Sequence, residues 1–198
     1  YLDSSAPVVG LAPLRNTLIV FHGGSVERIR GTIPPGFAAA NMELDPLFSE
    51  VGLSHLTALA VADEHAYFAD ENGVYQTDGA TISDLTEQGG MASYWQALFR
   101  DNTVANVAVG VDKGYLLISV LSSTSNGYID FLVCEIKSRS WFRFTNIRAL
   151  NFSAHQGSTD VVLFSNQDAT RLGKLLAFLP AAADNKNDGN GTAITPVV

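Results

Sequence analysis

The sequence predicts an all-β fold built from short antiparallel strands, and three observations lead to this prediction. Short apolar runs alternate with Gly, Asn, Asp and Ser, which is the pattern of an antiparallel β protein. A short motif recurs along the chain at a spacing typical of blade-like repeats. The strands also carry apolar side chains on both faces, as expected for sheets that are stacked between neighbouring sheets.

The predicted strands follow one another as hairpins. Asn-Gly pairs, the strongest short-range hairpin signal, stand at 72–73 and 126–127. The other turns hold Gly, Asn, Asp and Ser, which suit tight turns. In chain order, the predicted strands cover residues 18–21, 26–30, 66–68, 74–77, 116–121, 128–136, 141–144, 161–164 and 175–179.

One internal repeat supports the blade-like spacing. The motif Gly-Leu-x-x-Leu at residues 10–14 recurs at 52–56, an offset of about 42 residues, which is in the range of propeller blades. Each copy leads into an apolar strand, a Gly-containing turn and a second strand that ends in Gly, at Gly31 and Gly79. The two copies therefore predict one blade each.

The segment 128–137 shows the two-sided apolar character most clearly. A two-layer sandwich would expose one face of each sheet to solvent and is the less favoured alternative. We therefore predict a β-propeller-like array of about four antiparallel blades. Closed propellers commonly have more blades, so closure would need further residues or another chain. One face of the segment holds Tyr128, Leu132, Cys134 and Ile136, and the other holds Ile129, Phe131 and Val133.

One segment departs from the β pattern. Residues 93–100 place Tyr94 and Leu98, and likewise Trp95 and Phe99, four positions apart, which predicts a short helix near 93–101 with one apolar side. Ser93 is the expected N-cap. Two roles stay open for this helix. It is favoured as a plug over the end of a blade, and the alternative is a docking helix for a partner.

Composition narrows the function classes. The chain has 198 residues, 16% of them charged and 46% apolar, with a net charge of -8. Specific nucleic-acid binding is not expected, because phosphate recognition needs clustered positive charge. No apolar run is long enough for a membrane span, so membrane insertion is not expected either. A low charge content suggests that much of the surface is covered, in part by other subunits.

The chain is predicted to divide into a propeller-like domain at 1–180 and a polar linker at 181–198 that ends in the start of a further extended segment. Residue 1 is Tyr rather than Met, and the last residues begin an extended segment, so we expect a partial chain. The single cysteine, Cys134, lies among apolar residues and is expected to be a buried thiol.

Few residues suggest chemistry. The four histidines, His22, His55, His65 and His155, stand far apart and are expected in loops or at the surface. The stretch 184–191 is similar to a calcium loop, with Asp184 and Asp188 as weak metal candidates. Lys186 at the third position of that pattern opposes a bound cation, so a flexible linker is favoured and no metal or cofactor is expected.

Two acidic pairs were considered as the paired carboxylates of a glycosidase. They are Asp63 with Glu64 and Asp70 with Glu71, which two loops could bring within reach of each other. Their position in tight β-turns favours ordinary solvated side chains instead. We predict no catalytic residue and no enzyme activity.

Aromatic residues are the remaining candidates for an interface or a ligand surface, since aromatic rings dominate interface energetics. Alternation along 141–144 places Trp141 with Arg143 on one face and Phe142 with Phe144 on the other, and the Phe pair is expected to face the core. The interface or ligand candidates are Tyr94, Trp95, Phe99 and Trp141.

Several stretches carry a resemblance to a known family. They are residues 14–21 with 25–29, 51–53, 66–75, 82–83 with 94–95, and 135–144. Together they resemble the propeller-type virion proteins of tailed bacteriophages, a group that includes tail tubular or nozzle proteins and minor tail proteins. In that group such stretches mark the end of one blade and the start of the next. The resemblance covers about residues 8 to 180, rests on blade geometry, and carries over no catalytic residue.

The resemblance implies a structural component of a phage virion, in the tail or neck, that acts through protein–protein assembly. Its expected partners are copies of itself and other virion proteins. Its expected location is the phage particle, after synthesis in the host cytoplasm. The alternative is a glycan-binding propeller for host attachment, with Trp95 or Trp141 as a stacking platform, and a glycosidase ranks lower.

Overall fold

The structure, a computed structural model, describes residues 6–15, 17–31, 43–122, 129–145, 149–154, 161–164, 176–177 and 195–197. Within these residues the chain forms four antiparallel sheets and a few short helical segments. None of the four described sheets closes on itself. The all-β prediction is therefore confirmed.

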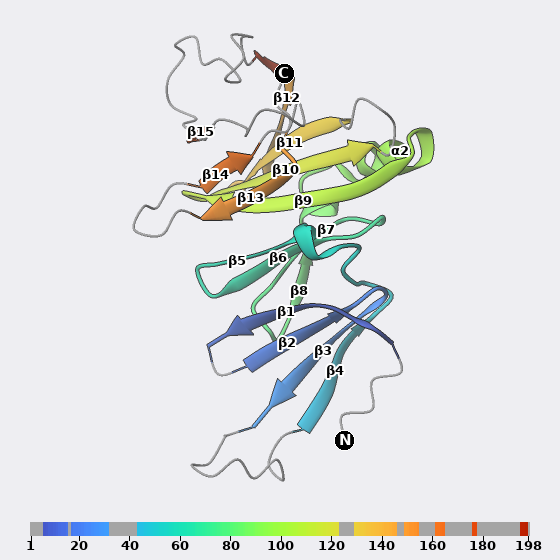
Figure 1. Ribbon diagram of the computed structural model, residues 1–198, viewed down its shortest axis with the longest axis vertical. Helices are drawn as coiled ribbons and strands as arrows, with labels where there is room; N and C mark the ends of the chain where they lie inside the picture. The colour runs from blue at the N-terminus through green and yellow to red at the C-terminus, as the bar shows by residue number, and fades with distance from the viewer. Residues whose placement is uncertain are drawn as a thin grey trace.

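The four sheets follow one another along the chain and are arranged in sequence in space (Figure 1). The first contains β1 (Val8–Leu14), β2 (Thr17–His22), β3 (Ser25–Arg30) and β4 (Glu43–Ser49). The second contains β5 (Leu59–Ala62), β6 (His65–Ala69), β7 (Val74–Thr77) and β8 (Ile82–Asp84). The third contains β9 (Val104–Asp112), β10 (Tyr115–Ser122), β11 (Asp130–Glu135), β12 (Ser140–Thr145) and β16 (Thr195–Val197). The fourth contains β13 (Asn151–Ala154), β14 (Val161–Phe164) and β15 (Leu176–Ala177).

Strand order within the first two sheets, and over β9 to β12 of the third, follows chain order, so each is a simple meander. The first strands of successive sheets are neighbours. β1 contacts β5 and β6, β5 contacts β9, and β9 contacts β13. The chain thus starts each new sheet beside the start of the preceding one.

These first strands were largely missed by the sequence prediction. β5 reads Leu-Ala-Val-Ala and is short, and β9 reads Val-Ala-Asn-Val-Ala-Val-Gly-Val-Asp, in which Ala, Asn and Gly interrupt four Val residues of high strand propensity. Close packing explains their composition. A Cβ atom at Gly110 of β9 would lie 2.5 Å from Cγ of Phe152 on β13, so only Gly allows this approach of the two sheets.

The predicted repeat does not mark equivalent positions. Residues 10–14 lie inside β1, whereas residues 52–56 lie in the connection before β5 and reach only the start of the 3-10 helix η2 (Leu56–Ala58). The first strands begin at Val8, Leu59, Val104 and Asn151, so the sheets recur at a longer spacing, closer to 45–50 residues. Gly31 and Gly79 do follow the third strand of their sheets, as the repeat suggested.

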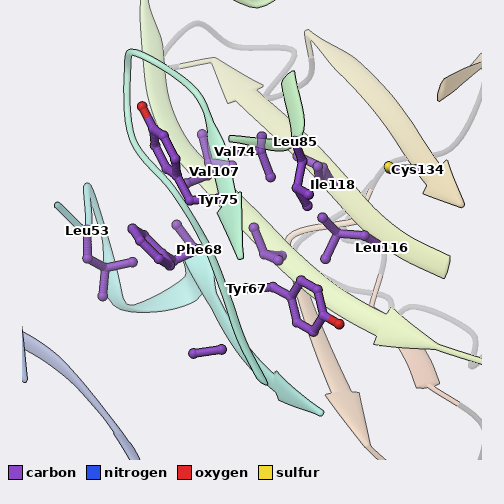
Figure 2. Packing of buried hydrophobic residues seen from close by; sticks show 14 of the residues in the cluster. Leu53, Tyr67, Phe68, Val74, Tyr75, Leu85, Val107, Leu116, Ile118 and Cys134 are labelled. Atoms are coloured by element: carbon purple, nitrogen blue, oxygen red, sulfur yellow. The ribbon is translucent and has the colours of Figure 1, made fainter. Parts of the chain in front are cut away.

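The main core lies between the first, second and third sheets. Phe21 of β2 packs on Phe68 of β6 with ring centroids 4.9 Å apart. Tyr67, on the other face of β6, lies toward Leu116 and Ile118 of β10, and all of these side chains are buried (Figure 2). The second sheet is therefore covered on both faces.

The third sheet is also covered on both faces. Leu132 and Cys134 of β11 belong to the main core, while Phe131 and Val133 point to the opposite face. There they form a second cluster with Leu117 and Ala149, against which Phe144 and Phe152 pack. The prediction of two-sided apolar strands is confirmed for 131–134 and Ile136, whereas Ile129 packs against the main core instead of beside Phe131 and Val133, and Tyr128 lies outside the described residues.

The predicted helix is present as α2 (Ala92–Asp101), whose Trp95 and Leu98 are buried in the main core. The expected N-cap is wrong, because the helix begins after Met91 and no side chain caps it. A second helix, α1 (Leu85–Gln88), was not predicted. Asp84 accepts the backbone N–H of Glu87 and caps it, a signal that the Asp-x-x-Glu spacing carries.

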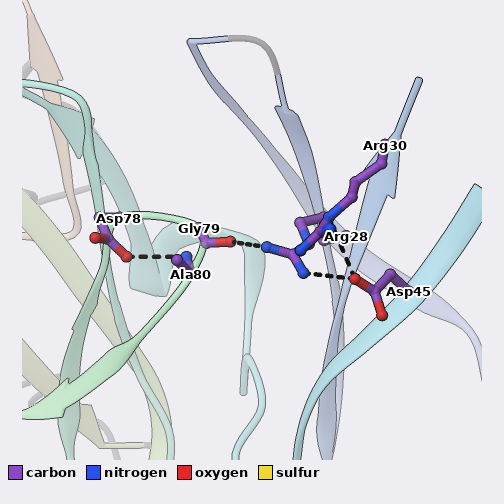
Figure 3. Close-up of polar contacts among 6 residues, drawn as sticks. All are labelled: Arg28, Arg30, Asp45, Asp78, Gly79 and Ala80. Carbon is purple, nitrogen blue, oxygen red and sulfur yellow. Dashed lines mark hydrogen bonds and ion pairs between the residues drawn. The ribbon is translucent and has the colours of Figure 1, made fainter. Parts of the chain in front are cut away.

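Polar contacts fasten the first two sheets together on their outer side (Figure 3). Arg28 of β3 donates to the carbonyl oxygen of Gly79 in the β7–β8 turn at 2.9 Å. The same guanidinium pairs with Asp45 of β4.

Of the predicted linker, only Thr195–Val197 is described, as β16, and 181–194 lie outside the described residues.

We expect Gly52→Ala to destabilise the fold. A Cβ atom there would lie 2.5 Å from the carbonyl oxygen of His22 and from the carbonyl carbon of Gly23. Backbone atoms cannot rotate away as a side chain can, so the loss in the free energy of unfolding should be about 1–3 kcal/mol. Gly23→Ala is the control, because a Cβ there meets nothing within 4 Å. Urea unfolding measures both, and equal midpoints for the two variants would contradict the close packing.

Candidate functional site

Exposed apolar side chains gather along one region of the fold. Among the described residues six large apolar side chains are exposed, and five of them lie on the first strand of a sheet or within three residues of one. We call these five the first-strand rim: Val8 and Leu11 on β1, Leu56 in η2, Val61 on β5 and Leu150 directly before β13.

The rim runs along strand edges. β1, β5, β9 and β13 are each the terminal strand of their sheet. η2 lies beside β1, because the Leu56 side chain is 3.7 Å from where a Cβ at Gly10 would stand. Exposed apolar side chains beside strand edges are typical of surfaces that bind another protein.

An exposed ion pair joins the first two sheets at one end of β1. The guanidinium of Arg15 pairs with Glu64 in the β5–β6 turn. This contact holds the pKa of the Glu64 carboxyl below its usual range. Both side chains are more than half exposed, so the pair adds little stability and gives that end of the rim a polar border.

The rim was not predicted from the sequence. Its residues come from short apolar pairs beside Gly, Ala and Pro, and the periodicity of these segments is weak. A signal was nevertheless present. In β1, Leu11 and Pro13 alternate with Gly10, Ala12 and Leu14, and the structure exposes the first pair while burying the second set.

Asp70 is a polar side chain that is only 5% exposed and that accepts several backbone hydrogen bonds. Its Oδ1 accepts the backbone N–H groups of Asn72 at 2.7 Å and Gly73 at 3.0 Å, within the β6–β7 turn. Its Oδ2 accepts the N–H of Gly52 at 3.2 Å, from the connection between the first two sheets. The Asp70 carbonyl oxygen accepts Trp95 Nε1 at 3.1 Å, which ties α2 to the same point.

Burial raises the pKa of the Asp70 carboxyl, and the three backbone N–H groups oppose this rise only in part. A buried carboxylate with a raised pKa can mark an active site. Here both oxygens are occupied by backbone donors of the fold itself. The geometry therefore assigns Asp70 a structural role.

The acidic pairs do not form a glycosidase site. Asp63 and Glu64 lie in the two-residue β5–β6 turn, where both have positive φ and are exposed. Asp70 follows the other end of β6, which at five residues spans about 17 Å. Paired catalytic carboxylates stand about 5 to 9.5 Å apart, so these groups cannot act together. The expectation that Asp70 is solvated is also wrong, since it is buried.

The four aromatic candidates lie on α2 and β12, and most of them serve the core. Trp95 is fully buried, so the prediction that it offers a binding surface is wrong. Phe99 is half-buried against it, with ring centroids 5.4 Å apart. Trp141 is half-buried, and its Nε1 donates to the carbonyl oxygen of Leu85 at 3.2 Å.

Tyr94 joins a polar cluster between α2 and the third sheet. Its hydroxyl donates to Asp130 of β11, which is 1% exposed. Arg143 of β12 donates from Nε to Asp130 at 2.8 Å and lies over the Tyr94 ring, 5.7 Å from its centroid. The helix is thus fixed to the sheet by charge-assisted bonds as well as by Trp95.

The expectation for the two phenylalanines of β12 is half right. Phe144 packs edge-on against Phe131, with centroids 6.5 Å apart. Phe142 is 44% exposed and is the one exposed large apolar side chain of the described residues that lies off the rim.

Among the cysteine and the histidines, Cys134 and His55 follow the predictions, whereas His22 is buried and His65 is half-buried in β6. Cys134 is buried as expected, and burial raises the pKa of its thiol to about 12. His22 is fully buried on β2, contrary to the prediction, with Nδ1 3.1 Å from the Pro7 carbonyl oxygen and Nε2 3.0 Å from Glu27 Oε2. His55 is exposed as predicted, and His155 lies outside the described residues.

In the described part of the chain, no group of three or more His, Cys, Asp or Glu side chains could hold a metal ion. The weak metal candidates Asp184 and Asp188 lie outside that part. None of the helices described there is long and apolar enough to cross a membrane. The chain matches no model of a known protein family, and no curated protein matches it.

We expect Asp70→Asn to lower the free energy of unfolding by about 1–3 kcal/mol, because an amide nitrogen would face one of the backbone donors. The loss should grow as the pH falls from 7 to about 4. With a raised pKa, the folded wild type takes up the proton at a higher pH than the unfolded chain, so its stability rises over this interval, and the amide has no such gain.

Asp78→Asn is the matched control with the opposite sign. Backbone N–H groups of Thr81 and Ala80 hold the pKa of the exposed Asp78 carboxyl below its usual range. Its contribution is therefore lost as the pH falls, and the effect of the substitution should shrink. Denaturant unfolding from pH 7 to 4 measures both, and parallel pH profiles for the two variants would contradict this assignment.

Proposed function

We propose that this chain is a structural component of a tailed-phage virion, in the tail or neck, that acts by binding copies of itself and other virion proteins. The observation that carries the assembly role is the first-strand rim, where exposed apolar side chains line terminal strands. Such edges favour association unless another protein covers them. The proposal assigns the chain no catalytic step, cofactor, specific nucleic acid or membrane insertion.

A propeller-like arrangement of the sheets is part of the proposal. Its support is the succession of meander sheets, each stacked on the next, with their first strands side by side. Propeller blades are four-stranded sheets arranged around a central channel. In such an arrangement the rim would face that channel, and further sheets from this protein or another copy would complete the ring.

The phage assignment rests on the resemblance carried by the short motifs. Residues 66–75 form the turn and strands of the β6–β7 hairpin, and 135–144 run from β11 through a turn into β12. Both are strand–turn–strand segments inside one sheet rather than junctions between two sheets, and their hairpin form is the support for the resemblance. The virion is the corresponding location, and mass spectrometry of purified particles of the encoding virus should detect the chain. Its absence from such particles would overturn the assignment.

The glycan-binding alternative has less support. Of its two stacking platforms, Trp95 is buried and Trp141 is packed beside α1. A Cβ at Gly89 would lie 2.2 Å from Trp141 Nε1, so this indole is in close contact with the backbone. Assembly is accordingly the function that the surface favours.

We expect the double variant Leu11→Asn with Val61→Asn to weaken self-association at least tenfold. Both side chains are about half exposed, and losing their burial at an interface should remove about 1.4 kcal/mol or more. Sedimentation velocity over a concentration series gives the dissociation constants. Thr81→Asn, in the exposed β7–β8 turn, is the control that should leave association unchanged. Equal effects of both changes would argue against the rim.

A further inference from the structure

The outer edges of the first three sheets differ in how well they are protected. β4, at the outer edge of the first sheet, contains Pro46 and the acidic residues Glu43 and Asp45, and its pairing with β3 is interrupted by a bulge. Proline, charge and bulges are the features with which natural edge strands prevent pairing with another chain. β4 is therefore a protected edge.

The second sheet protects its outer edge by shortness. β8 has only three residues, Ile82–Asp84, and the chain turns directly into α1 at Leu85. A very short strand followed by a helix offers few backbone groups for pairing.

β12 is less protected, since its one charged side chain is Arg143, which pairs with Asp130 of β11. Its six residues, Ser-Trp-Phe-Arg-Phe-Thr, include no proline and no acidic residue, and it pairs with β11 in unbroken register from Phe131↔Phe144 to Glu135↔Ser140. This edge is covered by strand addition instead. β16 pairs antiparallel with it over Arg143↔Val197, Phe144↔Pro196 and Thr145↔Thr195.

β16, the strand that pairs with this edge, is joined to β15 by a long stretch of chain, which we call the tether. Residues 178–194 separate β15 from β16 and include the Asn-, Asp- and Gly-rich stretch 184–191. Seventeen residues can span up to about 55–60 Å. The tether length thus permits β16 to reach the β12 edge of another copy as well as its own.

We propose that the β12 edge is a strand-acceptor site, which in the assembled protein takes the Thr195–Val197 strand of a second copy. This inference rests on the proposed assembly function. Exchange forms the same three residue pairs between copies that β16 forms within one copy, so it sacrifices no contact. A ladder of three pairs is also short enough to open and exchange readily. Inside an assembly, the β16 strand of a neighbouring copy is present at the β12 edge at an effective concentration that matches that of the chain's own β16.

Mixing two variants of the full chain, each with one added cysteine, tests the exchange. One carries Thr145→Cys and the other Thr195→Cys, which face each other in the ladder. After mild oxidation, a disulfide-linked heterodimer is expected at about ten times the yield of a control mixture. The control pairs Thr145→Cys with Thr81→Cys, whose site is exposed but belongs to a different sheet turn. The native Cys134 is buried and is common to all mixtures.

The double variant Thr145→Cys with Thr195→Cys separates the outcomes. Linked heterodimer in the mixture supports exchange between copies. A disulfide within the double variant, without heterodimer in the mixture, overturns exchange, as does no disulfide in either. Sedimentation of the same samples distinguishes the absence of strand exchange from failure of the proposed function. Association that depends on Leu11 and Val61 can persist when no strand exchange occurs.

Discussion

The carboxylate of Asp70 is the polar contact on which the arrangement of the first two sheets depends. It binds its own turn and the N–H of Gly52 at the same time. The connection that contains Gly52 is held from the other side too, since Leu53 N donates to the His22 carbonyl oxygen at 2.8 Å and Ser54 Oγ to that of Ala69 at 3.1 Å. Residues 52–54 thus connect the two sheets through hydrogen bonds to both of them, and Asp70 accepts one of these bonds. We call residues 52–54 the strap.

This anchoring explains why a charged group is kept in an apolar interior. Trp95 donates to the Asp70 carbonyl oxygen, so the helix, the turn and the strap meet at one residue. Removing a carboxylate from water is unfavourable, and three backbone donors offset that cost while none of them is left unsatisfied.

The sequence predicted the parts of the fold that are strongly apolar. Strands rich in branched and aromatic residues, such as β10 and β11, were recognised together with the two-sided burial of β11. The first strands were missed because their small residues reflect contact with a neighbouring sheet, and a contact between distant segments leaves no local pattern. For the same reason the buried state of Asp70 and His22 could not be anticipated, since each depends on partners from another element. The aromatic residues were predicted as interface or ligand candidates, and spacing alone could not show that Trp95 faces inward.

The two surfaces proposed for association, the first-strand rim and the β12 edge, lie on different strands of the sheets. The rim follows the first strands, whereas the proposed strand-acceptor site lies at β12, where β16 pairs with the third sheet. In the proposed assembly, one surface would associate through apolar side chains and the other through backbone pairing, which requires a matching extended segment. In the proposed assembly, the two surfaces would bind different neighbours, because they lie on different strands of the sheets.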